Sequence, residues 1–171
     1  MLDAIRERFS CRSFRSDPVT DAQLREVLGA GFCAPSGHNA RPWHFTVVTD
    51  QEKRRQLSEV HQYARMCARA PVVLVICADR AKAPDWWLDD SAAAIENILI
   101  QAQALGLGTC WIGIHAAKTP DGGSRQDYVR SVLDIPPEIT VVALIALGHP
   151  AAASPSRPDR YEPDKVHWET W

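Results

Sequence analysis

The sequence predicts one domain in which α-helices and β-strands share a single sheet. Segments with apolar residues at helical spacing alternate along the chain with short runs of apolar and β-branched residues. The chain has 171 residues, of which 46% are hydrophobic. A chain of this length can bury about 70% of the surface that it exposes when unfolded. We therefore expect residues 1–171 to form a single domain with one full core.

Two helices are predicted from their capping residues. Thr20 followed by Gln23 forms a capping-box pattern, and the helix that it begins should end near Gly31. Asp50 can cap a second, strongly charged helix, which we expect to continue to about Tyr63.

The remaining elements are predicted from the spacing of their apolar residues. The longest helix covers Asp89–Leu105, and alanines on much of its other surface indicate a central, buried position. Pro71–Ala78 is a continuous apolar run, which is typical of a strand covered on both faces. Shorter helices are expected at Leu2–Arg8 and Arg125–Leu133, and further strands at His44–Thr49, Gly106–Ile114 and Ile139–Leu147.

Composition excludes several classes of partner. A net charge of -2 with 23% charged residues gives no basic surface for a polyanion, so we expect no nucleic acid partner. No segment has the length of a signal peptide core or the roughly 20 apolar residues of a membrane span, so we expect no membrane association and a cytoplasmic location.

The cysteines lack any C-x-x-C pair, which argues against a disulfide framework or a zinc site and indicates a reducing compartment. They are Cys11, Cys33, Cys67, Cys77 and Cys110.

Several common catalytic motifs are absent. The chain has no G-x-G-x-x-G after a strand, no phosphate-binding P-loop, no H-E-x-x-H and no G-x-S-x-G. The usual nucleotide-binding, zinc-protease and serine-hydrolase interpretations therefore fail. "GLG" at Gly106–Gly108 follows a predicted helix rather than a strand, so we interpret it as a helix cap.

One loop stands out within "GFCAPSGHNARPWHF", Gly31–Phe45. Prolines, a glycine and short polar side chains exclude regular structure there, and Trp43 follows at once as an apolar anchor. Such a loop is typical of a binding or catalytic segment, although a plain connector with a packing tryptophan has the same composition.

Arginines near both ends of the chain suggest an anion site. "SCRSFRSD" places Arg12, Ser13 and Arg15 between two predicted helices, where extended spacing would bring Arg12 and the Ser13 hydroxyl near one point. Arg160 lies in "RPDRY" near the other end. Shielded guanidinium contacts to phosphate contribute about 1.5 to 3 kcal/mol each, so two such clusters suit one phosphate. A solvated basic turn is the alternative interpretation of the first cluster.

The segment after Gly148 is rich in proline and has almost no periodicity, yet it ends in tryptophans at Trp168 and Trp171. Disordered tails rarely end in this way. We therefore expect an extended arm that packs on a neighbour, such as a second subunit.

Taken in order, "CRSFR", "APSGHNARPWHF", "DDSAAAIENILIQAQALGLGTCWIG", "ALGHP" and "RPDRYEPDKVHWETW" make the chain resemble the nitroreductase-like flavin enzymes. The resemblance spans the whole chain. It implies an α+β homodimer with a central mixed or antiparallel sheet flanked by helices and an extended C-terminal arm. It also implies FMN at the subunit interface, reduced by NADH or NADPH and reoxidised by nitroaromatics, quinones or related small aromatic acceptors in alternating half-reactions.

The resemblance further implies roles for arginines and one serine. Arg12 and Ser13 match the positions that hold the FMN phosphate and ribityl chain, and Arg160 matches the arginine that completes the phosphate site. Arg15 matches the basic residue at the pyrimidine edge of the flavin. A fixed cation there stabilises the negative charge that develops on the reduced ring.

Two further segments match cofactor-binding positions of the family. One is the loop that reaches across from the other subunit to cover the flavin, and the other is a strand whose backbone lies along the ring, with the Gly113 amide near the nitrogen that receives hydride. The loop residues are Pro35, Ser36, Gly37 and Asn39, and the strand residues are Trp111, Ile112 and Gly113. No side chain is nominated as an acid, a base or a nucleophile, because hydride passes directly between nicotinamide and flavin.

The chain departs from the family pattern at three points. Cys11 stands where a first basic residue is usual, so one contact to FMN is missing or supplied otherwise, and Ile114 stands where many members have a second glycine. The chain also lacks the long insertion that often covers the substrate site.

The walls of the substrate pocket have two candidates, Lys82–Asp90 and His115–Arg125. Trp86 and Trp87 could stack on a flat acceptor, or one could pack in the core and the other shield the dimer interface. The histidines receive no role. Three functions remain open: a broad nitro or quinone reductase, a specialised flavoenzyme of the same fold such as a flavin destructase, dehalogenase or heterocycle oxidase, and a non-catalytic flavin-binding dimer.

Overall fold

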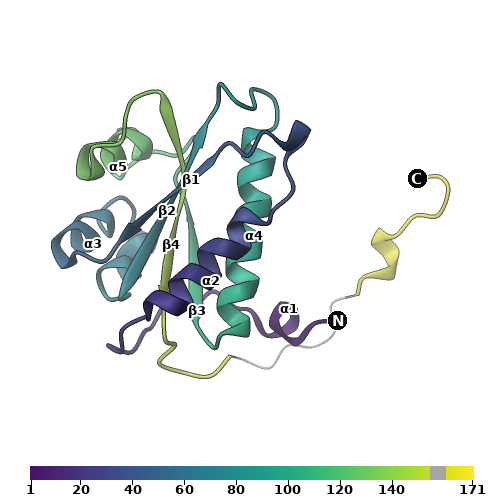
Figure 1. Cartoon of the computed structure of the whole chain (residues 1–171), viewed down its shortest axis with the longest axis horizontal. Helices are drawn as coiled ribbons and strands as arrows, with labels where there is room; N and C mark the ends of the chain where they lie inside the picture. Colours follow the sequence, from purple (N-terminus) through teal and green to yellow (C-terminus); the bar gives the residue numbers. More distant parts are fainter. Residues whose placement is uncertain (155–160) are drawn as a thin grey trace.

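The computed structural model describes residues 1–154 and 161–171. Four strands form one sheet in the order β1-β2-β4-β3, and every neighbouring pair is antiparallel (Figure 1). The resemblance implied a mixed or an antiparallel sheet, and the sheet in the structure is antiparallel. The strands are β1 (Trp43–Val48), β2 (Val72–Asp79), β3 (Gly108–Gly113) and β4 (Ile139–Gly148).

The sheet is antiparallel because of where the last strand is inserted. Helix α4 (Trp87–Ala104) returns the chain from β2 to β3, so that these two strands run in the same direction. Strand β4 then pairs antiparallel with both of them and lies between them. No parallel pair is left in this sheet, and β1 and β3 are its two edges.

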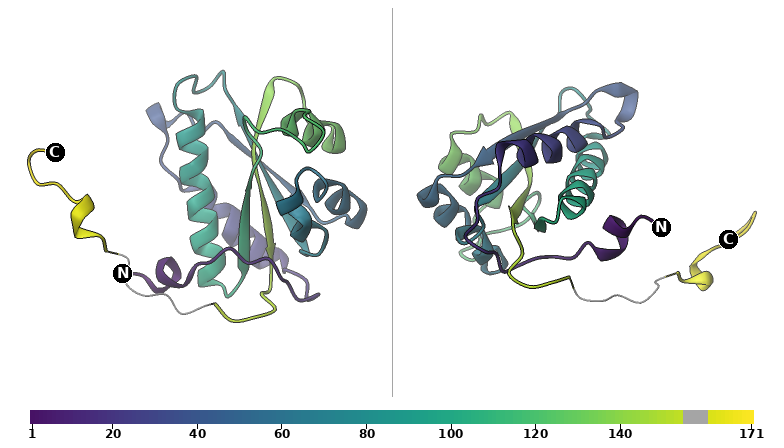
Figure 2. Two further views of the ribbon diagram at one scale, coloured as in Figure 1. Left: turned by 180° about the vertical axis from the view of Figure 1, so that it is seen from behind. Right: turned by 60° about the horizontal axis from the view of Figure 1, so that its bottom comes forward.

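Helices cover both faces of the sheet (Figures 1 and 2). Helices α2 (Asp21–Phe32) and α4 lie on one face, and α3 (Gln51–Leu57), η2 (Gln62–Ala68) and α5 (Arg125–Leu133) lie on the other. Alternate side chains of β2 enter the two core clusters, with Leu74 in the first and Val75 in the second. The prediction that β2 is covered on both faces is confirmed, since its residues from Val72 to Ala78 are at most 2% exposed. Helix α1 (Asp3–Glu7) completes the set of α-helices in the described chain.

The caps behave as predicted, but one predicted helix is divided. Thr20 and Gln23 form the capping box, and Asp50 Oδ1 accepts a hydrogen bond from the Lys53 amide at 2.8 Å. Helix α3 nevertheless ends at Leu57 instead of continuing to Tyr63. His61 has an extended backbone, with φ of -163°, and its Nδ1 accepts a hydrogen bond from the Tyr63 amide. If the first helix continued, the Tyr63 amide would donate to a backbone carbonyl one turn earlier. It donates to the His61 side chain instead, and the separate 3-10 segment η2 begins here.

The loop between α2 and β1 is largely irregular, as predicted, although α2 extends to Phe32 and one 3-10 turn, η1 (Gly37–Asn39), interrupts the loop. Three of its residues have left-handed backbone conformations, which are uncommon for residues other than glycine. They are His38 with φ of 52°, Asn39 with 54° and Arg41 with 48°. Such residues persist only where surrounding contacts fix them.

Helix α4 supplies the long-range contacts that fix this loop. The Gly37 amide donates a hydrogen bond to Oδ1 of Asp90 at 2.9 Å, across 53 positions of the sequence. A Cβ added at Gly37 would lie 2.9 Å from Cδ1 of Trp86, so the loop backbone packs directly on that indole. Asp90 is only 6% exposed, and its Oδ2 has no hydrogen bond within the described part of the chain. The first turn of α4 therefore acts as the base on which the loop rests.

The C-terminal segment, residues 161–171, is exposed throughout and contains one 3-10 turn, η3 (Pro163–Lys165). It lies apart from the sheet and its helices in Figure 1. The expectation that this arm packs on a second subunit stays a prediction. No helix among the described residues has the length and apolar character needed to cross a membrane.

Two glycines of α2 should respond in opposite ways to replacement by alanine. Gly29 has nothing within 4 Å of an added Cβ, so Gly29→Ala should stabilise the protein by about 0.5 to 1 kcal/mol through helix propensity. An added Cβ at Gly31 would lie 2.9 Å from Ile98 Cδ1 and 3.1 Å from Phe45 Cζ. Overpacking costs about 1 to 3 kcal/mol, so Gly31→Ala should be destabilising. Urea denaturation of both variants measures the difference, and an equal response would contradict the close packing of α2 on α4.

Asp90→Ala should destabilise the protein by about 1 to 3 kcal/mol, because it leaves the partly buried amide of Gly37 without an acceptor. Asp89→Ala is the matched control, since Asp89 is an exposed carboxylate in the same helical turn. Limited proteolysis should show faster cleavage between residues 34 and 42 in the Asp90 variant alone. Equal cleavage of the two variants would show that Asp90 does not hold the loop.

Candidate functional site

The N-terminal segment places Arg12 beside the edge strand β3. Ser10 forms a parallel bridge with Thr109, and the Cys11 amide donates a hydrogen bond to the Thr109 carbonyl at 2.8 Å. The Arg15 amide then bonds the His149 carbonyl, which holds the segment against the end of β4. Arg12 lies between these two attachments, so its position depends on the sheet.

Beyond Thr109, the outer edge of β3 is open. Backbone groups of successive residues in a strand point to opposite sides. The Thr109 carbonyl points outward to Cys11, so the backbone groups of Trp111 and Gly113 also point outward. The Gly113 carbonyl confirms this direction, since it accepts a hydrogen bond from Nη1 of Arg125 at 3.0 Å. The amides of Trp111 and Gly113 therefore face this edge as hydrogen-bond donors.

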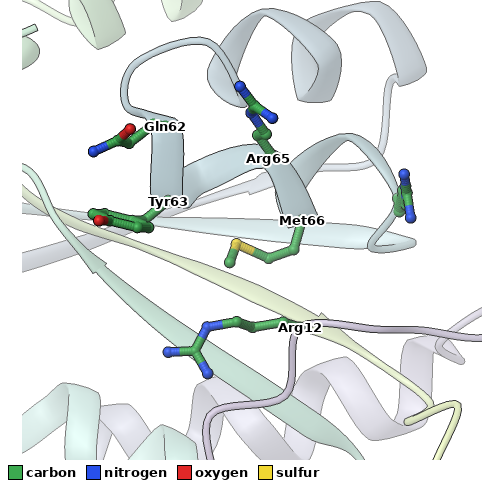
Figure 3. Close-up of a pocket in the computed structure, with 6 residues that line it drawn as sticks. Arg12, Gln62, Tyr63, Arg65 and Met66 are labelled. Atoms are coloured by element: carbon green, nitrogen blue, oxygen red, sulfur yellow. The ribbon is translucent and has the colours of Figure 1, made fainter. Parts of the chain in front are cut away.

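Two adjoining cavities follow this edge and share Arg12 and Tyr63, and we call them together the β3-edge groove. The cavity along the strand has a volume of about 400 Å³, and its lining consists of Arg12, His61, Tyr63, Cys110, Trp111, Ile112, Gly113, His115, Ala117 and Arg125. The cavity beside η2 has a volume of about 280 Å³, and its lining consists of Arg12, Gln62, Tyr63, Arg65, Met66 and Arg69. In Figure 3 Met66 lies between η2 and Arg12, while the Arg65 side chain points away from Arg12.

The charges of the groove are all positive. Four arginines line it, no carboxylate does, and none of the four forms an ion pair within residues 1–154 and 161–171. Burial lowers the pKa of His61, and the charge of Arg125 lowers it further. Burial, with the charge of Arg80, also lowers the pKa of His115. Both imidazoles are therefore neutral at pH 7, and the arginines carry the charge of the groove.

The thiols near the groove are not nucleophiles. Burial raises the pKa of Cys110, although the nearby charge of Arg12 partly opposes this. Burial also raises the pKa of Cys11, whose Sγ donates a hydrogen bond to the Ser13 carbonyl at 3.2 Å. Both thiols are therefore protonated at neutral pH.

The structure brings together only some of the residues selected from the sequence. Arg12 and the three strand residues Trp111, Ile112 and Gly113 line the groove. Ser13 and Arg15 belong to the same segment but do not line it, and Arg15 instead pairs with Asp17 at 2.6 Å. Arg160 lies outside the described residues. The four loop residues precede β1, at the opposite edge of the sheet, and they are Pro35, Ser36, Gly37 and Asn39.

Sequence reasoning missed the groove residues of η2, among them Tyr63 and Arg65, and also Arg69, which follows η2 directly. The two arginines so close together in "YARMCARA" were the available signal. The His115–Arg125 loop was a candidate pocket wall, and both of its end residues do line the groove.

The two tryptophans proposed as stacking surfaces do not line the groove in the described part of the chain. Trp87 is 8% exposed and packs edge-on against His115, with ring centroids 4.8 Å apart. Trp86 is 52% exposed and lies against the loop at Gly37. The interpretation that one tryptophan belongs to the core is confirmed.

Solved structures with this architecture are known. An FMN-dependent nitroreductase from Clostridium difficile superposes with a TM-score of 0.94 at 30% sequence identity, and all of both chains is covered. This similarity extends over the sheet, the helices that cover it and both termini.

Sequence comparison leads to the same group. A protein of Methanothermobacter thermautotrophicus, provisionally named NADH dehydrogenase/NAD(P)H nitroreductase, is 35% identical over 100% of this chain and 87% of its own length. A protein of Archaeoglobus fulgidus with the same provisional name is 35% identical over 99% of this chain and 98% of its own length. The model of the Nitroreductase family matches residues 5–62 and 58–149, which include Arg12, the loop and the whole of β3. With most of its length matched in this way, the chain belongs to the Nitroreductase family.

Proposed function

We propose that this protein is an FMN-dependent oxidoreductase that transfers hydride from NADH or NADPH to nitroaromatics, quinones or related small aromatic acceptors. Family membership and relatives named NAD(P)H nitroreductase support the reaction class. The single observation that carries the proposal is the β3-edge groove, which combines four arginines and outward-facing backbone amides and is lined by no carboxylate of the described residues.

The residues of this groove fit FMN by their chemistry. FMN combines one phosphate with a flat ring whose edge accepts hydrogen bonds. Arg12 has no ion pair in the described chain. Its Nη1 donates to the Ser10 carbonyl at 3.2 Å, and the other N–H groups of the guanidinium can bond a phosphate. The amides of Trp111 and Gly113 are donors at an open strand edge. FMN, when bound, supplies the hydride acceptor and donor of the reaction.

The protein supplies binding, orientation and exclusion of water. Strand β3 is held by β4 along its whole length, so the Gly113 amide is fixed by the sheet rather than by a mobile loop. Arg125 bonds the carbonyl of the same residue and holds the end of the strand in place. A fixed donor and a fixed cation stabilise developing negative charge without a reorganisation cost. Ser13, Arg15 and Arg160 remain proposed contacts to FMN.

We also propose a homodimer in which the loop of one subunit covers the groove of the other. The loop leads into β1 and the groove follows β3, and these are opposite edges of one sheet. Three strand spacings of about 4.8 Å separate the edges by about 14 Å. One chain therefore does not bring its own loop to its own groove, whereas a second copy could. The exposed C-terminal segment is a candidate for further contact between subunits.

One departure from the family pattern favours a second candidate, a non-catalytic flavin-binding dimer. Cys11 is 2% exposed and packs under Gly108, so this position adds no cation to the groove. Steady-state oxidation of NAD(P)H with and without a quinone separates this candidate from the reductase.

The purified protein should be yellow, and its absorbance should bleach anaerobically when NADH or NADPH is added.

Arg12→Ala should weaken FMN affinity about 10- to 100-fold, because a charged contact to the phosphate is lost. Fluorescence titration with FMN measures the affinity. Arg25→Ala is the control, since Arg25 is an exposed arginine of α2 that lines neither cavity of the groove. A colourless protein that takes up no FMN would overturn the proposed function. Equal FMN affinities of the two variants would show that Arg12 does not bind the phosphate.

A further inference from the structure

We propose that Arg125 is a specificity residue that recognises an anionic group on the acceptor, so that aromatic acceptors bearing a carboxylate are preferred over neutral ones. This inference rests on the proposed function, because it concerns the second ligand of the same groove.

The guanidinium of Arg125 is oriented before any ligand arrives. Its Nε donates to the Lys118 carbonyl at 2.7 Å, and its Nη1 donates to the Gly113 carbonyl at 3.0 Å. Its Nη2 has no hydrogen bond to any residue that the structure describes. Both existing partners are neutral carbonyls, so the positive charge is positioned without being neutralised. Little conformational entropy is then lost when an anion binds.

The surroundings of Arg125 contain no competing anion. The cavity that Arg125 lines includes two neutral imidazoles, those of His61 and His115, and one further cation, Arg12. The charge of Arg125 contributes to the lowered pKa of His61, which shows that its field reaches into this cavity. Arg130 in the same helix differs from Arg125, because it forms an ion pair with Asp127 at 2.8 Å.

The proposed cofactor leaves Arg125 without a ligand. FMN carries one phosphate, and Arg12 is assigned to it. Arg125 bonds the carbonyl of Gly113, the residue whose amide is proposed to face the reacting edge of the ring. Its free Nη2 is therefore near the place where an acceptor must approach. Trp111 is 41% exposed in the same cavity and offers a flat apolar surface to an aromatic ring. A cation beside such a surface fits an aromatic carboxylate.

The test compares 4-nitrobenzoate with its neutral methyl ester. In the wild type we expect tighter binding and a higher kcat/KM for the carboxylate. Arg125→Gln should lower the carboxylate-to-ester ratio of kcat/KM about 10- to 100-fold, mainly through KM, because the charged contact is lost. The amide nitrogen of the glutamine occupies about the place of the arginine Nε, so it can still donate to the Lys118 carbonyl. Arg125→Lys keeps the positive charge but not the paired N–H donors of the guanidinium, so it should restore part of the preference for the carboxylate. Arg25→Gln should leave the ratio unchanged.

Calorimetric titration without NAD(P)H gives a second readout that does not depend on turnover. The affinity for 4-nitrobenzoate should fall about 10- to 100-fold in Arg125→Gln, while the affinity for the ester should change much less. Both affinities are measured on protein reconstituted to the same FMN content. An unchanged ratio in both measurements would overturn the inference. A changed preference between NADPH and NADH, with an unchanged carboxylate-to-ester ratio, would also overturn the inference. Arg125 would then recognise an anionic group of the electron donor rather than one of the acceptor. Loss of FMN from the wild type would instead overturn the proposed function.

Discussion

The constraint on which this structure depends is the burial of its two central strands on both faces. Strands β2 and β4 are lined on each side by apolar residues from helices, and no charged side chain enters either cluster. Polar and functional groups can therefore occupy only the edges and ends of the sheet. The groove follows the β3 edge, and the strained loop leads into the β1 edge. The positions of the groove and of the loop at opposite edges thus follow from the packing of the centre.

The groove is suited to anions because its arginines are left without protein carboxylates. Elsewhere the chain pairs many of its charges, as in the contacts of Arg55 with Glu52 and Glu59 on α3. A cation that is oriented by carbonyl groups keeps most of its attraction for a ligand, whereas an ion pair would have to be broken first. The edge of β3 adds backbone donors that only a substitution by proline would remove. These features support the proposed binding of FMN.

The sequence predicted the elements of the fold better than the site. Local signals were sufficient for α5 and for the cap at Thr20, since these depend on neighbouring residues. The separate segment η2 was missed because one bond between the His61 side chain and the Tyr63 amide caps its start. The groove joins Arg12 to residues about a hundred positions further along, and only pairing of the N-terminal segment with β3 brings them together. Family resemblance selected those residues, and periodicity alone would not have done so.

The strand order has a consequence for how the protein is made. Strand β4 occupies residues 139–148 of a 171-residue chain, yet it belongs between β2 and β3 at the centre of the sheet. Until the ribosome has released this strand, the apolar surfaces of β2 and β3 have no partner between them. Pairing over such long sequence separations is slow, and incomplete sheets of this kind are prone to aggregation. The sheet therefore cannot be completed until residues 139–148 have left the ribosome.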